Sequence, residues 1–428
     1  KAFRWSSDRL DEHRGGIICF ISNGGWLDGN AQDGFRKHLE REFSSVYVFN
    51  LRGNQRTSGE LSRREGGKIF GSGSRAPIAI ALLVKNLKAS RNKATIYYHD
   101  IGDYLTREEK LERIVQLSTV TNPDFNWEII TPNEAGDWIN QRSASFSKFI
   151  PIGDKGNKDG KSYFVPNYSS GVKTNRDAWC FNSNRDKLVQ KIKESIDYYN
   201  SQVDGFSSAK SQTNDLTVED FITYDSTRFS WDAQQRIDII KGMKYSFDPE
   251  SIRISSYRPF FKQYLYFNRH LNNRVYQMPK LFPDSKVSNL VICTSGIGVT
   301  KEFSCIITNM MPDLELVGKS QCFPLYHFEE IGVGNWKMID SSQSLLDVGD
   351  THLSNKCVRK DGISDFILNK ARKEYGDSGL SKEDIFYYVY GILHSPDYRK
   401  TFSNDLKKML PRIPLVDDVT DFWAFSQA

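Results

Sequence analysis

The chain has 428 residues, which is enough for two or three domains that each bury a core of their own. Its hydrophobic content of 39% and charged content of 26% are those of an ordinary globular protein. There is no signal-peptide pattern and no run near the roughly 18 apolar residues of a membrane span, so we expect a cytoplasmic protein without membrane association. The net charge of +5 mildly favours a polyanionic partner.

Three apolar runs predict the strands of a buried sheet in the first part of the chain. Residues 15–23, 46–51 and 78–84 are apolar on both faces, as is typical of strands covered by helices on both sides. Shorter patterns predict the tail of a helix within 1–14, helices at 33–42 and 107–116, and an edge strand at 95–99. Residues 1–14 are too few to form earlier strands that could bind a nucleotide-like cofactor, and residue 1 is Lys, so we expect a fragment of a longer enzyme.

The second part of the chain follows a segment, 121–170, in which Pro, Gly, Asn and Ser are frequent. Such punctuation predicts an irregular linker, so we expect domains at 1–120 and 171–428. Within the second domain the patterns predict helices at 184–200, 232–243, 360–375 and 382–393, and strands at 263–267, 275–278, 289–295, 302–308 and 322–328. Ser381 and Asp384 have the spacing of a capping box at the start of the last helix.

The cysteines show no CxxC pair and no nearby His at zinc-ligand spacing, which argues against a metal site. We expect them to be reduced, buried thiols of a cytosolic protein. They lie at positions Cys19, Cys180, Cys293, Cys305, Cys322 and Cys357.

A polar segment, 52–73, joins two of the buried strands, and loops at strand ends carry function more often than cores do. Phe70 lies in this segment among glycines and polar residues. One interpretation is a stacking platform for a base that is rotated out of a DNA duplex, as base-modifying enzymes require. The other is a loop residue that folds back onto its own domain, and the residues alone leave both open.

Several ordered segments of the chain are similar to one enzyme family. GIICFISNGGWLDG, FRKHLEREFSSVYVFNLRGN and GGKIFGSGSRAPIAIALLVKN resemble the later motifs of gamma-class adenine-N6 DNA methyltransferases, above all those of type ISP single-polypeptide restriction-modification enzymes. GVKTNRDAW, SYRPFFKQYLYFNRHLNNRVYQMP, CFPLY, SKEDIFYYVYGILHSPDYR and LPRIP resemble the C-terminal specificity region of the same enzymes. The resemblance implies an α/β, Rossmann-like methyltransferase half-domain followed by a mixed α+β target-recognition domain. It also implies that Phe70 contacts the flipped adenine.

The departures from this family limit what the chain can do. It has neither the glycine-containing strand-turn motif that binds S-adenosylmethionine nor the catalytic Asn-Pro-Pro-Tyr/Phe motif. Asn122-Pro123-Asp124-Phe125 is a near match, but it follows the late strands and predicts a turn, and Gly296-x-Gly298 lacks a third glycine. We therefore expect no catalytic residue here and a cofactor site mostly outside this chain. The resemblance assigns ATP and Mg to helicase and nuclease domains upstream in the same polypeptide.

The segment 253–280 is the best candidate for contact with double-stranded DNA, because it mixes aromatic residues with base-reading and phosphate-binding types. Arg reads guanine and Asn or Gln reads adenine in the major groove, while Lys and Arg also bind phosphates. Arg269 and Arg274 are the first choices for base contact. The alternative is a β-hairpin with an aromatic core and a solvated charged face. The candidate residues are Arg253, Arg258, Lys262, Arg269, Asn272, Asn273, Arg274, Gln277 and Lys280.

Two further residues, Lys173 and Arg176, either contact phosphates or form a structural turn with Asp177. The resemblance implies a parent enzyme that methylates adenine N6 and that translocates along and cleaves unmodified DNA, with this chain supplying sequence recognition and part of the target-base pocket. Two other interpretations stay open. One is the tail of a type IIG restriction-methyltransferase without a helicase, and the other is a non-catalytic DNA-binding or assembly module.

Overall fold

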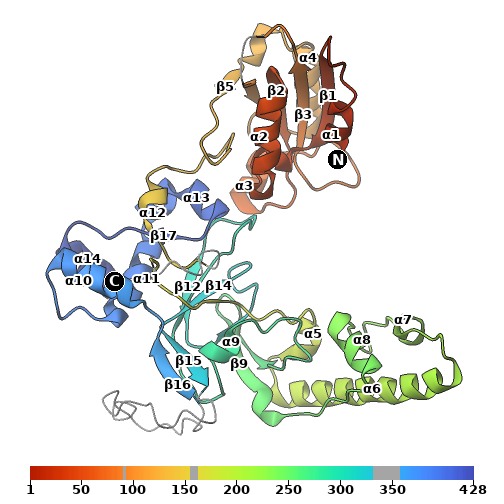
Figure 1. Ribbon diagram of the computed structural model, residues 1–428, viewed down its shortest axis with the longest axis vertical. Helices are drawn as coiled ribbons and strands as arrows, with labels where there is room; N and C mark the ends of the chain where they lie inside the picture. The colour runs from red at the N-terminus through yellow and green to blue at the C-terminus, as the bar shows by residue number, and fades with distance from the viewer. Residues whose placement is uncertain (90–92, 155–161, 331–356) are drawn as a thin grey trace. The chain divides into compact units, whose positions relative to one another are not determined.

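The computed structural model describes residues 1–89, 93–154, 162–330 and 357–428, which form two compact units (Figure 1). The first unit comprises 1–148 with the short segments 298–302 and 402–409, and the rest of the chain forms the second. The change from one unit to the other at residue 148 falls inside the segment 121–170 that was predicted as an irregular linker. Described residues of this segment also pack in both units, since Trp138 is 2% exposed in the first unit and Phe164 is fully buried in the second.

A five-stranded sheet forms the centre of the first unit, in the order β1-β3-β2-β4-β5. β3 runs antiparallel between β1 and β2, whereas β2 and β4 are parallel. The first three strands confirm the predicted ones, but β4 is not the edge strand that was expected, because β5 pairs with it. The strands are β1 (Gly16–Asn23), β2 (Ser45–Arg52), β3 (Ile78–Lys85), β4 (Thr95–Asp100) and β5 (Glu128–Ile130).

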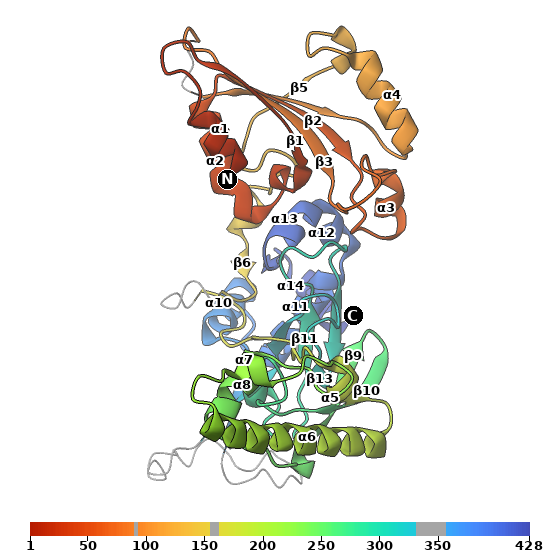
Figure 2. The same cartoon turned by 90° about the vertical axis from the view of Figure 1, so that its right-hand side faces the viewer.

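Helices lie on both faces of this sheet, and Figure 2 shows α2 and α4 on opposite sides of it. Alternate residues of β2 serve the two faces: Val46 and Val48 pack in one core with Leu39 of α2, and Phe49 packs in the other with Leu117 of α4. The helices are α1 (Ala2–Ser7), α2 (Asp33–Glu42), α3 (Gly59–Glu65), α4 (Arg107–Leu117) and α13 (Ser403–Lys408), with short 3-10 helices at Gly24–Leu27, Asn30–Gln32, Pro123–Phe125 and Phe146–Lys148.

The outer face of β1 departs from the prediction that helices cover both sides of every strand. Ile17 and Ile21 on this strand are 64% and 61% exposed, and β1 is an edge strand among the described residues. The opposite face of β1 is covered as expected, because Ile18 is buried in the same core as Leu39 of α2. The edge thus presents both unpaired backbone and apolar side chains.

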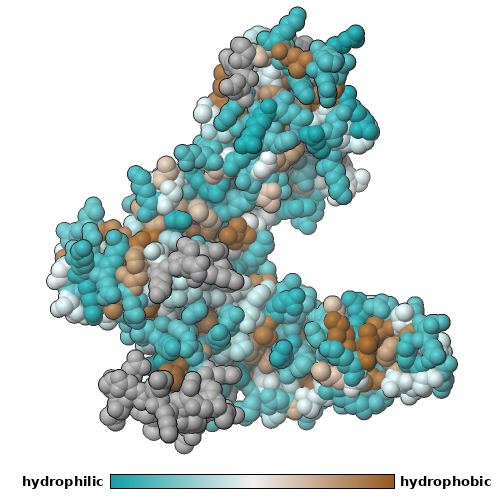
Figure 3. Space-filling model, in the orientation of Figure 1, coloured by the Kyte–Doolittle hydropathy of each residue, from teal (hydrophilic) through white to brown (hydrophobic). Residues whose placement is uncertain are grey.

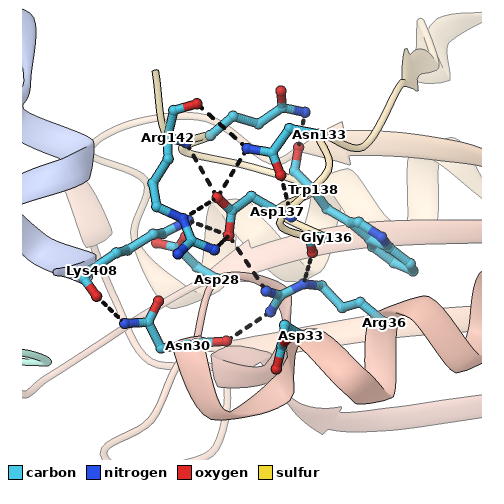
Figure 4. A network of polar contacts seen from close by, with 12 residues as sticks. Asp28, Asn30, Asp33, Arg36, Asn133, Gly136, Asp137, Trp138, Arg142 and Lys408 are labelled. Atoms are coloured by element: carbon cyan, nitrogen blue, oxygen red, sulfur yellow. Dashed lines mark hydrogen bonds and ion pairs between the residues drawn. The ribbon is translucent and has the colours of Figure 1, made fainter. Parts of the chain in front are cut away.

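An ion-pair network fastens α13 to the first unit (Figure 4). Lys408 Nζ lies 2.6 Å from Asp28 Oδ1 and 3.4 Å from Asp137 Oδ1. Asp137 also accepts a 2.8 Å hydrogen bond from Arg142 and lies 3.7 Å from Arg36, and the side chains of Asp137 and Arg36 are fully buried. Burial disfavours the charged carboxylate, but the hydrogen bond from Arg142 and the charge of Lys408 contribute to a lowered pKa of Asp137.

The second unit is built on two four-stranded sheets, β13-β9-β10-β8 and β12-β11-β14-β7, and on the pairs β15-β16 and β17-β6. Their bounds are β6 (Ile150–Pro151), β7 (Ser169–Ser170), β8 (Phe181–Asn182), β9 (Ile252–Arg258), β10 (Phe261–Tyr266), β11 (Val291–Thr294), β12 (Cys305–Thr308), β13 (Met311–Pro312), β14 (Gln321–Pro324), β15 (Tyr326–Glu330), β16 (Cys357–Asp361) and β17 (Arg412–Ile413). The helices are α5 (Asp177–Cys180), α6 (Arg185–Gln212), α7 (Val218–Phe221), α8 (Ala233–Ile240), α9 (Met278–Leu281), α10 (Asp365–Tyr375), α11 (Lys382–His394), α12 (Pro396–Thr401) and α14 (Val419–Gln427), with a 3-10 turn at Pro249–Ser251.

The long helix α6 confirms the prediction at 184–200 and continues to Gln212. Asn184 caps its first turn by accepting a hydrogen bond from the Lys187 amide. Val203 and Phe206 stay buried beyond the predicted end, so the apolar stripe that drives the helix also extends it. Figure 3 shows apolar residues on the surface over α8, where Ile237 and Ile240 are exposed.

Three other predictions in the second unit need correction. Residues 275–278 are not a strand but a loop that leads into α9, whose first residue Met278 is fully buried. The helix predicted from residue 360 begins at Asp365, because β16 runs to Asp361 and Ser364 caps the helix. β9 was not predicted, since its Arg and Ser residues weaken the β pattern. The Ser381–Asp384 capping box is confirmed.

Among the described residues the cysteines are reduced and form no disulfide bond, in agreement with the prediction of reduced thiols. Cys180, Cys293, Cys305 and Cys322 are buried, but Cys19 is exposed on β1 and Cys357 is partly exposed. The prediction that all are buried is therefore wrong for these two.

Candidate nucleic-acid interface

The β9–β10 hairpin carries much of the segment predicted to contact DNA. Arg258 pairs with Phe261, which leaves Pro259 and Phe260 as a two-residue loop. No Asp or Glu occurs between Glu250 and Asp284, so the six basic residues of this stretch are not offset by any carboxylate of the same stretch. They are Arg253, Arg258, Lys262, Arg269, Arg274 and Lys280.

Arg258 is held by two carboxylates from other segments. Its guanidinium pairs with Asp313 and lies 3.4 Å from Asp177 Oδ2, and its Cζ stands 4.0 Å from the centre of the Tyr257 ring. The Asp313 side chain is only 4% exposed, and burial is the main cause that raises its pKa to about 7. These contacts hold Arg258 at the turn end of the hairpin, where its side chain is still 36% exposed.

Arg176 is a structural residue rather than the expected phosphate ligand. Its guanidinium donates to the carbonyls of Ser230 at 2.6 Å and Leu271 at 2.9 Å, and it pairs with Asp232 at 2.9 Å. The residue is 4% exposed. The predicted alternative of a structural turn is nearer the truth, but the carboxylate partner is Asp232 and not Asp177.

Asn272 likewise lies inside the unit and does not face solvent. It is 3% exposed, donates to the Tyr266 carbonyl at 3.2 Å and accepts from the Asn268 amide at 3.0 Å. Its neighbour Asn273 is partly buried and donates to Asp232 at 3.2 Å. Both amides therefore shape the loop after β10, and the expected base contact does not fit Asn272.

The structure brings Lys173 and Arg274 side by side, although a hundred residues separate them in the chain. Each backbone amide donates to the other residue's carbonyl, at 2.9 Å and 3.0 Å. Lys173 is partly buried, whereas the Arg274 side chain is exposed. Two of the segments predicted to bind DNA thus meet at a backbone bridge within the second unit.

Five candidate side chains are exposed on this unit and free to meet a ligand's phosphates or base edges. Arg253 differs from them, because burial lowers its pKa and its buried Nε has no hydrogen-bond partner among the described residues. The exposed residues are Lys262, Arg269, Arg274, Gln277 and Lys280. The exposure of Arg269 and the burial of Arg176 could not be read from residue type. The burial of Arg176 depends on a distant partner, Asp232.

Phe70, the predicted target-base contact, lies in the first unit on the loop before β3 and is 46% exposed. One end of the loop is fixed: Lys110, whose side chain is buried, donates to the Gly67 carbonyl at 2.8 Å, and burial lowers the pKa of Lys110 to about 8. The other end is held by Arg75, whose carbonyl accepts a 2.9 Å hydrogen bond from the Gln55 amide. Only the middle of the loop is open, since a Cβ on Gly71 or Gly73 would meet no atom within 4 Å. The geometry leaves the Phe70 ring accessible.

Within the described ranges, no group of three or more His, Cys, Asp or Glu side chains could hold a metal ion. None of the described helices is both long enough and apolar enough to cross a membrane.

The family model of the Type ISP C-terminal specificity domain matches residues 163–428. The whole chain is also similar to solved structures. A nuclease-deletion mutant of the Type ISP restriction-modification enzyme LlaGI, in complex with a DNA substrate mimic, is 36% identical with a TM-score of 0.79, and the chain covers 30% of it. The ATP-dependent Type ISP enzyme LlaBIII bound to DNA is 33% identical with a TM-score of 0.80, and 25% of it is covered.

A third structure, of a DrdV–DNA complex, is 30% identical with a TM-score of 0.78, and the chain covers 38% of that protein. Each of these matches includes the whole of this chain, which spans only 25% to 38% of the length of the matched proteins. No curated protein matches it.

Proposed function

Because the chain belongs to the family of Type ISP C-terminal specificity domains, we propose that it recognises double-stranded DNA on behalf of a restriction-modification enzyme. The observation that carries this proposal is the surface around the β9–β10 hairpin. Exposed Arg269, Arg274 and Gln277 are residue types that read base edges, and Lys262 and Lys280 are types that bind phosphates. No carboxylate of the stretch between Glu250 and Asp284 opposes them.

The test is a binding titration of single alanine variants. The cognate sequence would first be found by sequencing N6-methylated adenines in DNA from cells that make the enzyme. Cognate and scrambled duplexes would then be titrated at two salt concentrations. A lost base contact, expected for Arg274→Ala or Arg269→Ala, weakens only cognate binding, by roughly 1–3 kcal/mol.

A lost phosphate contact, expected for Lys262→Ala, weakens binding to both duplexes and reduces the salt slope by about one. Lys241→Ala is the matched control, because Lys241 is an exposed lysine at the end of α8, outside the hairpin stretch. If all of these variants bind both duplexes as the wild type does, the interface lies elsewhere.

The first unit is proposed to be the second half of an adenine-N6 methyltransferase domain, with Phe70 in the target-base pocket. Support comes from its sheet, in which an antiparallel strand, β3, lies between β1 and β2, and from the exposed apolar edge at β1, where a further strand could pair. The loop of Phe70 joins the end of β2 to the start of β3. The end of β1 lies at this same end of the strands. Ligands of open α/β sheets bind at such strand ends.

S-adenosylmethionine, the methyl donor of the proposed parent enzyme, does not fit a site made by this chain alone. The glycine turn after β1 is already filled, because the Gly24 amide donates to the Pro77 carbonyl at 2.7 Å and the Gly25 amide to Asn23 Oδ1 at 2.8 Å. Neither amide is left for a cofactor. We place that site, the catalytic motif, and the ATP- and Mg-dependent helicase and nuclease activities in other parts of the parent polypeptide. The type IIG alternative differs in lacking the helicase, so helicase motifs upstream would decide between the two.

A further inference from the structure

Phe260 sits at the tip of the β9–β10 hairpin in an arrangement that folding alone does not favour. Its side chain is 96% exposed, and its backbone φ of 62° lies in the left-handed region. With Pro259 before it, the loop has the features of a type II turn, whose third position normally takes Gly or Asn. A large apolar residue there is both strained and solvated.

The ring makes no compensating contact within the part of the chain that the structure describes. No aromatic pair or cation–π contact among the described residues involves Phe260, whereas the neighbouring Phe261 ring lies 6.3 Å from that of Tyr257. Phe261 therefore packs along the hairpin and Phe260 projects beyond it. Strained residues that persist without internal compensation are a reason to look for a functional role.

The hairpin below the tip is firmly held. Ser255 Oγ donates to the Met311 carbonyl at 2.7 Å, and Ser256 and Thr308 share a 2.7 Å hydrogen bond. Arg258, directly before the loop, is fixed by its two carboxylates. An exposed ring on a rigid support can be pushed into a partner without the support giving way.

The charge around the tip selects the kind of partner. Lys262 is exposed close to the loop and forms no ion pair among the described residues, and the whole stretch between Glu250 and Asp284 lacks carboxylates. A partner that combines anionic groups with flat apolar faces between them is a nucleic-acid duplex. Architectural DNA-binding proteins insert such apolar wedges between base pairs and kink the duplex.

We propose that Phe260 is a wedge that inserts between two base pairs of the bound duplex. The ring unstacks one base step and bends the DNA around the specificity domain. This role rests on the proposed DNA recognition and differs from that of Phe70, which is proposed to hold the flipped base. Phe260 acts on the base stack and needs no flipped base.

The test compares two DNA duplexes of about 30 base pairs that share the same arbitrary sequence. One duplex is intact, and the other has a single abasic site at its centre. The abasic site removes most of the free-energy cost of unstacking the bases. The full chain should therefore bind the abasic duplex about tenfold more tightly than the intact one. Phe260→Gly should abolish this preference and keep binding to the intact duplex within about twofold. Phe260→Leu should restore part of it, because leucine also serves as a wedge.

Misfolding cannot explain a loss in Phe260→Gly, because glycine suits the left-handed turn better than phenylalanine does. Ile254→Ala is the matched control: Ile254 is 54% exposed on β9 of the same hairpin, and its removal should leave the preference intact. The wedge is refuted, and DNA recognition stands, if the wild type binds both duplexes equally well. The same conclusion follows if Phe260→Gly still prefers the abasic duplex. If the wild type binds neither duplex, the wedge is refuted, and the titration with the cognate duplex decides the proposed DNA recognition.

Discussion

At Phe260, the residue that would make the hairpin most stable differs from the residue that the proposed wedge requires. A bulky side chain in the left-handed region costs roughly 1–2 kcal/mol, and Phe260 also leaves its ring in water. A glycine would remove the strain, whereas a role in unstacking DNA requires the ring. Such costs are usually retained at sites where activity needs them.

The role of Phe70 can be tested by substitution. The residue is 46% exposed beside the open middle of its loop, so the ring can be removed without disturbing a core. In the full-length enzyme, Phe70→Ala should slow adenine methylation while duplex binding stays close to that of the wild type. Stacking of a base on an aromatic ring contributes roughly 1–3 kcal/mol, which corresponds to a rate loss of about fivefold to two-hundredfold.

Phe70→Tyr serves as the control, because it keeps the aromatic face and should methylate at nearly the wild-type rate. The measurements are single-turnover methylation rates and equilibrium duplex affinities. An alanine variant that methylates as fast as the wild type would make Phe70 a packing residue and remove it from the pocket.

Elements with a long, regular apolar pattern could be predicted from the sequence, and elements without one could not. β1, β2 and β3 are continuous apolar runs, and their positions were found. β9 was missed because its pairing with β10 and β13, and not its own composition, makes it a strand. The candidate site was found as a segment, 253–280, but not residue by residue. Whether an Arg faces solvent or Asp232 depends on contacts between distant parts of the chain.

The attachment of α13 to the first unit leads to a prediction for a whole element. Lys408 is 6% exposed and is one of the cations that offset the buried Asp137 carboxylate. Lys408→Met should lower the free energy of unfolding of this unit by about 3–5 kcal/mol, because removing one partner leaves a buried charge poorly compensated. Denaturant titration would measure the loss, and limited proteolysis would report release of residues 402–409.

The matched control is Lys407→Met, one residue earlier on the same helix and only partly buried. The effect should also depend on pH. The pKa of Asp137 is lowered in the folded state, so its contribution is complete above the unfolded pKa of about 4 and is lost as pH falls below it. The gap between wild type and Lys408→Met should therefore narrow in acid. An equal loss in both lysine variants, or a gap that widens in acid, would contradict the role of the network.

The two units of the molecule are not continuous in the amino-acid sequence. The first unit is completed by residues 298–302 and 402–409, which follow the start of the second unit in the sequence. A truncation after residue 148 would thus remove Lys408 from Asp28 and Asp137. Experiments on either unit should use the full chain, since neither unit is a single continuous segment.

The full chain by itself is expected to lack a cofactor site. Its sequence lacks the family's cofactor and catalytic motifs, and the Gly24–Gly25 turn is filled by hydrogen bonds to its own backbone and to Asn23. We therefore expect the purified chain to bind duplex DNA but to show no measurable S-adenosylmethionine binding by calorimetry and no transfer of a labelled methyl group to DNA. DNA binding by the same preparation is the control for folding. Cofactor binding in the micromolar range would contradict the prediction. It would mean that the strands β1 to β5 hold a complete cofactor site despite the missing motifs.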